Sequence, residues 1–126
     1  MLPEVPYIEI GKAKGVRQLV DLFYDFMDQL PEASHIRPLH AKSLRGSREK
    51  LFKFLSGWLG GPNLYIEEYG HPRLRRRHMP FKIGQQETDE WMFCMKKALA
   101  EMDLSAEFSK QLIESFQRTA DHMRNI

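Results

Sequence analysis

The segment HPRLRRRHMPF, residues 71–81, places a histidine directly after a run of arginines and between two prolines. On a helix, residues four apart share a face, so Leu74 and His78 point the same way while Arg73 and Arg77 line a neighbouring flank. The positive neighbours disfavour a second positive charge on the imidazole. A neutral imidazole can bind a metal through a ring nitrogen. The segment therefore favours a ligand histidine at position 78.

Three kinds of site are compatible with this segment from its residues alone. The first is a solvated basic helix whose histidine is satisfied in the core. The second is a phosphate site for nucleic acid or a phosphorylated metabolite, because arginine forks match phosphate oxygens. The third is a buried macrocycle whose iron binds His78 and whose carboxylates bind an arginine. Charge alone does not choose among them.

The cysteine and histidine pattern narrows the metal chemistry. A zinc site is disfavoured, because these 126 residues hold one cysteine and no histidine pair at ligand spacing on one helix. Covalent haem attachment needs the pattern C-x-x-C-H, which this sequence does not contain. Any haem is therefore expected to be held without covalent links.

Composition predicts one water-soluble domain spanning residues 1–126, with an N-terminal segment 1–15 and a core 16–126. Nineteen Lys and Arg against seventeen Asp and Glu leave a net charge of +2, so any basic function is local. The single cysteine, Cys94, forms no internal disulfide, and no signal-like start or membrane-spanning stretch is present in the sequence. We therefore expect a cytoplasmic protein with neither nucleic acid nor membrane as a partner.

Hydrophobic periodicity predicts the elements that position the histidine. Apolar residues from Val16 to Leu30 follow helical spacing up to Pro31, and residues 31–42 are expected to form a turn or short helical connection. Ser43 is the expected N-cap of the next helix, which Gly60 to Pro62 end. One apolar row of that helix consists of Ser47, Leu51, Phe54 and Trp58.

The second half of the chain predicts a loop over 63–70, a short helix over 72–79 and two long helices. Thr88 is the expected N-cap of the first long helix, and Ser105 begins the second. The buried residues of these helices are expected to be Trp91, Met95, Ala98 and Met102, then Phe108, Leu112, Phe116, Ala120 and Met123. With four substantial helices, one short helix and no strand pattern, the sequence predicts an all-α protein.

A longer set of motifs resembles a known family. FLSGWLGGPNLYIEEYGHPRLRRRHMPFKIG, followed by WMFCMKKAL, is similar to the truncated haemoglobins of the second group, and the likeness runs from about Val16 to the last helix. Its specific parts are GGP, the tyrosine of LY, GHPRLR, R-H-x-P-F and W-x-x-C-M, in this order. The resemblance implies a truncated globin fold, a two-over-two helical sandwich around haem b, in which the helix 72–79 supplies the proximal ligand.

The same resemblance implies roles for particular residues. His78 matches the proximal iron ligand, Trp91 and Tyr24 match distal residues, and His40 lies where many members carry tyrosine or phenylalanine. Ser47 occupies the position of the distal histidine of longer globins, while Arg77 and Lys50 are expected to meet the haem propionates. The full set of residues expected to contact the cofactor is His78, Tyr24, His40, Ser47, Lys50, Leu51, Phe54, Arg77, Phe81 and Trp91.

The chain also departs from the family pattern. Members commonly carry a Gly-Gly pair between the first two helices, whereas Gly11 and Gly15 are separate here, which predicts an altered or shortened N-terminal helix. The connection 31–42 is also a few residues longer than in some relatives.

The expected function is the binding of dioxygen, nitric oxide, carbon monoxide or another small haem ligand beside hydrogen-bond donors from Trp91, Tyr24 and His40. Three classes of activity remain open. One is redox chemistry that converts nitric oxide to nitrate or reduces peroxide, served by an unidentified reductase. Another is a ligand sensor or oxygen store without turnover. The third is a haem-free module that binds phosphate or nucleic acid through the arginines of residues 73–77. A monomer or weak dimer is expected.

Overall fold

The computed structural model describes residues 5–126, and within them the chain is helical without any strand. The all-α prediction is confirmed. The elements in chain order are α1 (Pro6–Glu9), α2 (Lys12–Gln29), η1 (Pro31–Ala33), η2 (Arg37–Leu39), α3 (Arg45–Trp58), α4 (Leu64–Tyr69), α5 (Leu74–His78), α6 (Gln85–Ala100) and α7 (Ala106–Met123).

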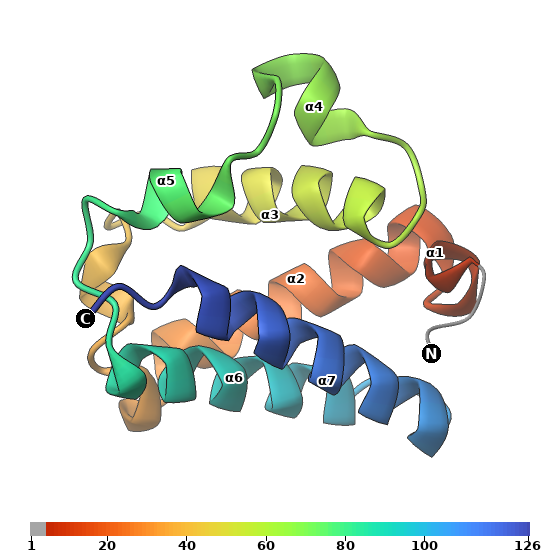
Figure 1. Ribbon diagram of the computed structural model, residues 1–126. Coiled ribbons are helices and arrows are strands. Elements are labelled where there is room, and N and C mark those ends of the chain that lie inside the picture. Colours follow the sequence, from red (N-terminus) through yellow and green to blue (C-terminus); the bar gives the residue numbers. More distant parts are fainter. Residues whose placement is uncertain (1–4) are drawn as a thin grey trace.

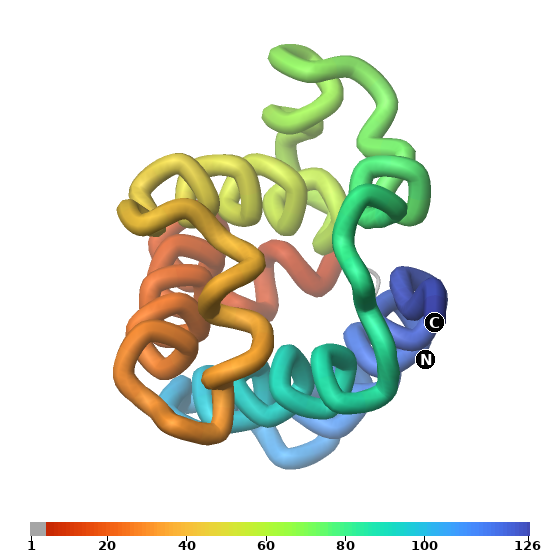
Figure 2. The backbone as a smooth tube through the Cα atoms, turned by 90° about the vertical axis from the view of Figure 1, so that its left-hand side faces the viewer, coloured from red at the N-terminus to blue at the C-terminus, as the bar shows by residue number. Residues whose placement is uncertain are grey.

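The four long helices form two pairs. α2 packs against both α3 and α6, and α6 packs against α7. Figure 1 shows α2 and α3 lying over α6 and α7, with α5 beside the end of α3. In Figure 2, α2 lies on one side of the molecule, between α3 and α6. On the opposite side, α5 and the chain that leads to α6 connect the two helix pairs. This is the two-over-two arrangement expected from the resemblance.

Much of the core comes from the apolar stripes that helical spacing predicted, although Trp91 is only partly buried and Met92, Cys94 and Leu99 are buried as well. On α2, Val16, Leu19 and Phe23 are fully buried, and on α7 Leu112 and Phe116 are buried opposite them. Such burial is the main favourable contribution to folding, because it removes apolar surface from water. Within residues 5–126, no helix has the length and apolar character needed to cross a bilayer.

The two separate glycines shape the corner between α1 and α2. Gly11 has a φ of 105°, in the left-handed region where a side chain is disfavoured. A Cβ placed on Gly15 would lie 1.8 Å from the carbonyl oxygen of Ile10, so only glycine fits this close approach. Gly11 therefore permits the left-handed backbone conformation, and Gly15 permits the close approach of the Ile10 carbonyl. α1 is a short helix, as the altered spacing predicted.

Several predictions about secondary structure are corrected by the structure, including the helix expected over 72–79, which spans Leu74–His78. The predicted loop 63–70 contains the helix α4. α6 begins before Thr88, because the Glu87 carboxylate accepts the Gly84 N–H at 2.8 Å and so satisfies the helix start. The Thr88 hydroxyl instead donates to the Gly84 carbonyl at 3.0 Å from inside the helix. α3 has Leu44 rather than Ser43 at its N-cap, while the Ser105 cap of α7 is confirmed.

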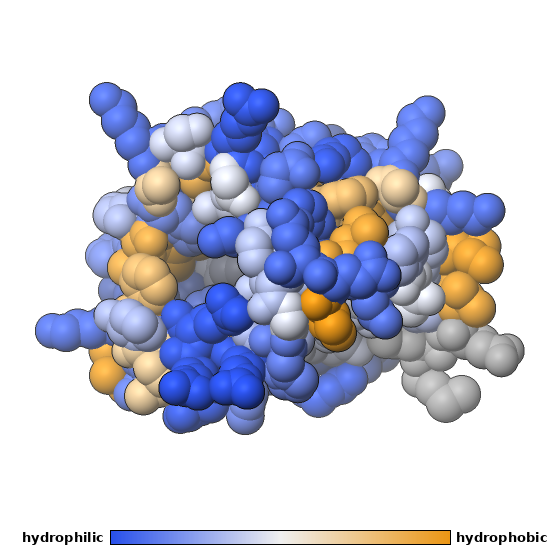
Figure 3. Space-filling view, turned by 90° about the horizontal axis from the view of Figure 1, so that it is seen from above, coloured by the Kyte–Doolittle hydropathy of each residue, from blue (hydrophilic) through white to orange (hydrophobic). Residues whose placement is uncertain are grey.

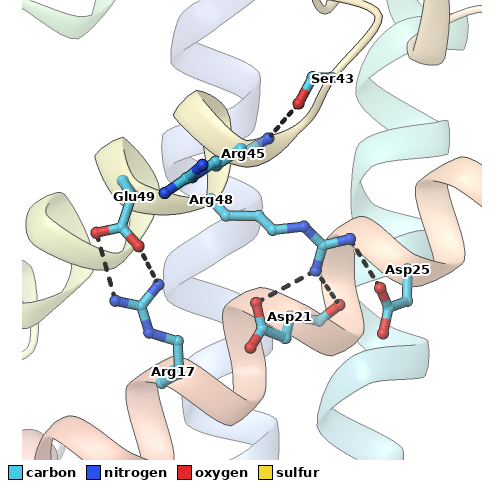
Figure 4. A network of polar contacts seen from close by, with 7 residues as sticks. All are labelled: Arg17, Asp21, Asp25, Ser43, Arg45, Arg48 and Glu49. Atoms are coloured by element: carbon cyan, nitrogen blue, oxygen red, sulfur yellow. Dashed lines mark hydrogen bonds and ion pairs between the residues drawn. The ribbon is translucent and has the colours of Figure 1, made fainter.

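Ion pairs fasten α3 to α2 along their exposed edge (Figure 4). Arg17 donates to Glu49 at 2.8 Å, and Arg48 reaches both Asp25, at 2.8 Å, and Asp21, at 3.2 Å. Each partly exposed pair contributes about 1 kcal/mol or less, so the network orients α3 more than it stabilises the fold.

Substitution of Gly15 tests whether the packing between α1 and α2 requires a glycine at this position. Gly15→Ala should lower the free energy of unfolding by about 1–3 kcal/mol, since the added methyl meets a backbone oxygen that must move. Gly46→Ala is the matched control, because a Cβ at this exposed helical position meets nothing within 4 Å. It should raise stability by up to about 0.5–1 kcal/mol. Denaturant unfolding measures both, and equal effects would contradict the packing argument.

Candidate functional site

A cavity of about 600 Å³ lies between the two helix pairs, bounded by α3, α5, α6, α7 and the connection 31–42. Figure 3 shows a hollow on the face that carries α3, α4 and α5, with strongly hydrophilic side chains beside it. A largely apolar cavity of this size with a few polar groups is typical of a cofactor site. Its wall includes all ten residues that the sequence proposed as contacts: His78, Tyr24, His40, Ser47, Lys50, Leu51, Phe54, Arg77, Phe81 and Trp91.

Several apolar wall residues were not proposed from the sequence. Phe116 and Met123 had been placed only on the inward stripe of the last helix, and Tyr65 had served only as a motif residue. The other apolar additions are Ile36, Leu39, Ala41, Leu55, Leu74, Ile83 and Ala120. Helical spacing marks such side chains as buried, but it does not separate those that touch a cavity from those that pack on each other.

His78 lies at the cavity wall with its tautomer determined by the backbone. Its Nδ1 is 2.6 Å from the carbonyl oxygen of Leu74, one helical turn earlier. Since a carbonyl can only accept, Nδ1 carries the proton and Nε2 holds a lone pair in the neutral ring. A hydrogen bond of this kind orients the imidazole and leaves Nε2 ready to bind a metal.

The segment that follows His78 is held mainly by Asn125, which lies just beyond α7. The side-chain amide of Asn125 donates to the carbonyls of Phe81, at 2.8 Å, and His78, at 3.3 Å. Its side-chain oxygen accepts the N–H of Ile83 at 3.0 Å, and its own N–H donates to the Ile83 carbonyl at 2.8 Å. Sequence reasoning missed this residue, because an asparagine beyond a helix end carries no mark of its distant partners.

Two hydrogen-bond donors line the opposite part of the cavity. Tyr24 is 6% exposed, and burial raises the pKa of its hydroxyl, against the lowering effect of Arg48, so the group stays protonated. The ring of Trp91 lies between Phe23 and Phe116, with centroid distances of 5.1 and 5.8 Å. Neither the Tyr24 hydroxyl nor the indole N–H has a hydrogen-bond partner within residues 5–126, so both can donate into the cavity.

His40 differs from the donor role expected of it. Its Nδ1 lies 2.9 Å from the carbonyl oxygen of Ile36, so this nitrogen carries the proton. Burial lowers the pKa of His40, the hydrogen bond to Ile36 opposes this effect, and the nearby Arg37 guanidinium lowers the pKa further. The neutral ring therefore offers Nε2 as an acceptor, whereas the sequence analysis counted His40 among the donors.

A buried carboxylate fastens the connection that carries His40. Glu90 is 8% exposed, and its Oε1 accepts the backbone N–H groups of His35, at 2.8 Å, and Ile36, at 3.2 Å. Its Oε2 lies 2.7 Å from Nδ1 of His35. The sequence contained no signal for this contact, because a glutamate within a helix usually faces solvent.

Two cations stand at the cavity wall. The Arg77 guanidinium lies 5.7 Å from the ring centroid of Tyr65 and donates to the Pro72 carbonyl at 2.7 Å. The Lys50 ammonium lies 5.8 Å from the ring centroid of Tyr69. Neither cation has a carboxylate within salt-bridge distance among residues 5–126. Both can therefore pair with the carboxylates of a bound molecule.

The donor set suits one kind of metal centre. Residues 5–126 contain no group of three or more His, Cys, Asp or Glu side chains able to hold a bare metal ion. The free Nε2 of His78 at the wall of a largely apolar cavity instead suits a metal that a macrocycle already holds. The cavity, its histidine and its two cations therefore fit a haem.

Comparison with known proteins identifies the class. Residues 6–125 match the family model of the bacterial-like globins, so the chain belongs to that family. Membership implies haem binding. Within the family the chain is a truncated haemoglobin of the second group, which confirms the resemblance seen in the sequence.

Three relatives illustrate the match. The Group 2 truncated hemoglobin YjbI of Bacillus subtilis (strain 168) is 41% identical over 122 residues, which cover 95% of this chain and 88% of the relative. The cold-adapted truncated hemoglobin of Pseudoalteromonas haloplanktis TAC125 superposes with a TM-score of 0.95 at 40% identity, over 98% of this chain and 99% of the other. The truncated oxygen-avid haemoglobin from Bacillus subtilis has a TM-score of 0.88 at 39% identity, over 97% and 100% of the two chains.

The buried carboxylate of Glu90 yields a second test. Glu90→Ala should lower the free energy of unfolding by about 1–3 kcal/mol, because two backbone N–H groups lose their acceptor. Asp89→Ala is the matched control, since this exposed neighbour bonds only Gln85 on its own helix. It should change stability by less than about 0.5 kcal/mol. Thermal or denaturant unfolding measures both variants, and a neutral Glu90→Ala would show that the connection is held by other contacts.

Proposed function

We propose that the chain binds haem b without covalent links in this cavity, with Nε2 of His78 as the axial ligand of the iron. The observation that carries the proposal is the 2.6 Å hydrogen bond from Nδ1 of His78 to the Leu74 carbonyl, which leaves Nε2 free at the cavity wall. The absence of C-x-x-C-H from the sequence supports a non-covalent attachment.

The other wall residues support the same assignment. Leu51, Phe54 and Phe81 offer apolar surface to the macrocycle, and burial of such surface favours binding. Arg77 and Lys50 would pair with the two propionates, since an unpaired buried charge is costly. Ser47 also lines the cavity, and its small side chain would leave room for a ligand.

When bound, ferrous haem supplies an iron site that binds dioxygen and shifts electron density onto it. The hydroxyl of Tyr24 and the indole N–H of Trp91 would donate to that density, and donors already oriented by the fold do so without reorganisation. Apolar side chains around them keep water away and strengthen both hydrogen bonds. We therefore propose tight binding of dioxygen, in line with the oxygen-avid relative from Bacillus subtilis.

The proposal has a direct spectroscopic test. The purified protein should show a haem absorption spectrum that changes on reduction and on exposure to carbon monoxide. His78→Gly should lose the signature of histidine ligation, and added imidazole should restore it. His71→Gly is the control, because that histidine belongs to the same segment but does not line the cavity. A His78→Gly spectrum identical to that of the parent protein would refute the axial role.

A second candidate function is redox turnover, in which bound oxygen converts nitric oxide to nitrate with electrons from a reductase. The dense set of polar groups around an otherwise apolar cavity favours it over a plain oxygen store. We predict that the oxygenated protein, mixed with nitric oxide by stopped flow in the presence of a reductant, turns over faster than free haem. Turnover at the rate of free haem, with fast reversible oxygen exchange, would instead assign a store or sensor.

A further inference from the structure

The arginine run of α5 is only partly explained by haem binding. Arg77 stands at the cavity wall, whereas Arg73, Arg75 and Arg76 do not line the cavity and are exposed to solvent. Lys82, just beyond α5, is exposed as well. None of these cations has a carboxylate within salt-bridge distance among residues 5–126. This short helix and its C-terminal flank therefore present more positive charge than the cavity uses.

The positive charge is local and has no acidic neighbours in the sequence. Between Glu68 and Glu87 the chain carries five Lys and Arg residues and no Asp or Glu. Because the whole chain has a net charge of only +2, the remainder of the molecule is net negative. A surface region of one sign attracts an oppositely charged partner and raises the rate of association. The expected partner is therefore acidic.

Two large apolar side chains lie exposed within the same segment. Met79 is 52% exposed and Phe81 is 42% exposed. A guanidinium nitrogen of Arg75 lies 3.7 Å from the sulfur of Met79, so the cation and the thioether belong to one surface. We define the arginine face as Arg73, Arg75, Arg76, Met79, Phe81 and Lys82. Arginine, methionine and aromatic residues are enriched at protein interfaces. A polyanion bound through its phosphates requires no such apolar contact.

Phe81 connects the arginine face with the cofactor cavity. Its ring is partly exposed and also forms part of the cavity wall. Its backbone carbonyl is held by the Asn125 amide at 2.8 Å, which fixes the segment in place. Figure 3 shows strongly hydrophilic side chains directly beside the hollow. A protein docked on this face would therefore contact the wall of the haem site. Such closeness favours electron transfer, because its rate falls steeply with distance.

We propose that the arginine face is the docking surface for an acidic electron-carrier protein that reduces the haem. The inference rests on the proposed haem binding at His78. In the transfer step the carrier loses one electron, the ferric iron gains it, and no bond forms or breaks. The iron is then ferrous and able to bind dioxygen. The contact is expected to be transient and to bury less than about 1,200 Å², as is usual for redox encounters.

Stopped-flow mixing measures the transfer step. Ferric, haem-loaded protein is mixed with pre-reduced flavodoxin or pre-reduced plant-type ferredoxin under carbon monoxide, whose ferrous complex marks each electron received. Arg76→Glu combined with Lys82→Glu should lower the bimolecular rate constant at least about tenfold at low salt, the low end of the range for electrostatic steering. The wild-type and variant rates should converge near 1 M salt, where the Debye length is about 3 Å.

Lys96→Glu combined with Lys110→Glu is the matched control. Both lysines are exposed, neither lines the cavity, and the change in net charge is the same. They belong to the last turns of α6 and the first turns of α7, which lie away from α5 in Figure 1. This variant should lose far less of the rate.

A second variant guards against damage to α5. A glutamate in the last turn of a helix is disfavoured by the helix dipole. Arg76→Gln combined with Lys82→Gln avoids this effect and should show a smaller loss in the same direction. Haem content and the midpoint potential of each variant, measured by spectroelectrochemistry, should match those of the wild type.

Cross-linking provides a readout that involves no redox step. A carbodiimide joins carboxylates to lysine amines that lie in contact with them. In a mixture with flavodoxin or ferredoxin, the cross-link should form at Lys82 and not at Lys96 or Lys110, as located by mass spectrometry. Arg76→Glu should reduce the yield at Lys82, because it weakens the attraction of the acidic carrier.

The outcomes separate the two proposals. A wild-type protein that takes up no haem defeats the proposed function. A haem-loaded protein whose transfer rates fall equally in the two charge-reversed variants, or fall in neither, overturns the docking surface alone. A dependence of only one carrier's rate on the arginine face identifies the carrier as a flavin or an iron–sulfur protein. Binding to phosphatidylserine vesicles or single-stranded RNA through these arginines, with both transfer rates independent of them, would assign the face to a polyanion and also overturn the inference.

Discussion

The hydrogen bond from Nδ1 of His78 to the Leu74 carbonyl is the interaction on which the rest of the site depends. It decides which ring nitrogen is free, and it requires that residues 74 and 78 remain one helical turn apart. α5 is a single turn, too short to be stable alone, because nucleating a helix costs more than one turn returns. Asn125 offsets this weakness by tying the chain after His78 to the end of α7. The proximal geometry therefore relies on a long helix far away in the sequence.

α6 positions polar groups on the side of the cavity opposite His78 through two neighbouring residues, Glu90 and Trp91. Trp91 packs between aromatic rings from α2 and α7 and lines the cavity. Its neighbour Glu90 is buried against the connection 31–42 and holds the backbone at Ile36. Because consecutive residues on a helix point about 100° apart, one helix positions an indole donor and, through the connection, the imidazole of His40. A disturbance of α6 should therefore reach both groups together.

The polar groups of the cavity differ in kind, and the difference bears on function. Tyr24 and Trp91 offer protons, whereas His40 offers a lone pair whose orientation the Ile36 carbonyl determines. Donors alone favour a ligand that carries partial negative charge, while a donor and an acceptor together favour a ligand that also carries a proton.

The sequence by itself determined the helical periodicity, the Ser105 cap, the family motifs and ten of the residues that line the cavity. These features are local, since each depends on spacing within a few turns or on a short motif. Only the three-dimensional structure decided the clamp at Asn125 and the burial of Glu90, together with two local contacts, the bond that determines the tautomer of His40 and the N-cap of α6 at Gly84 rather than Thr88. Most of these depend on contacts between segments distant in sequence or on one backbone carbonyl, and residue type does not reveal which carbonyl or N–H group a side chain will meet.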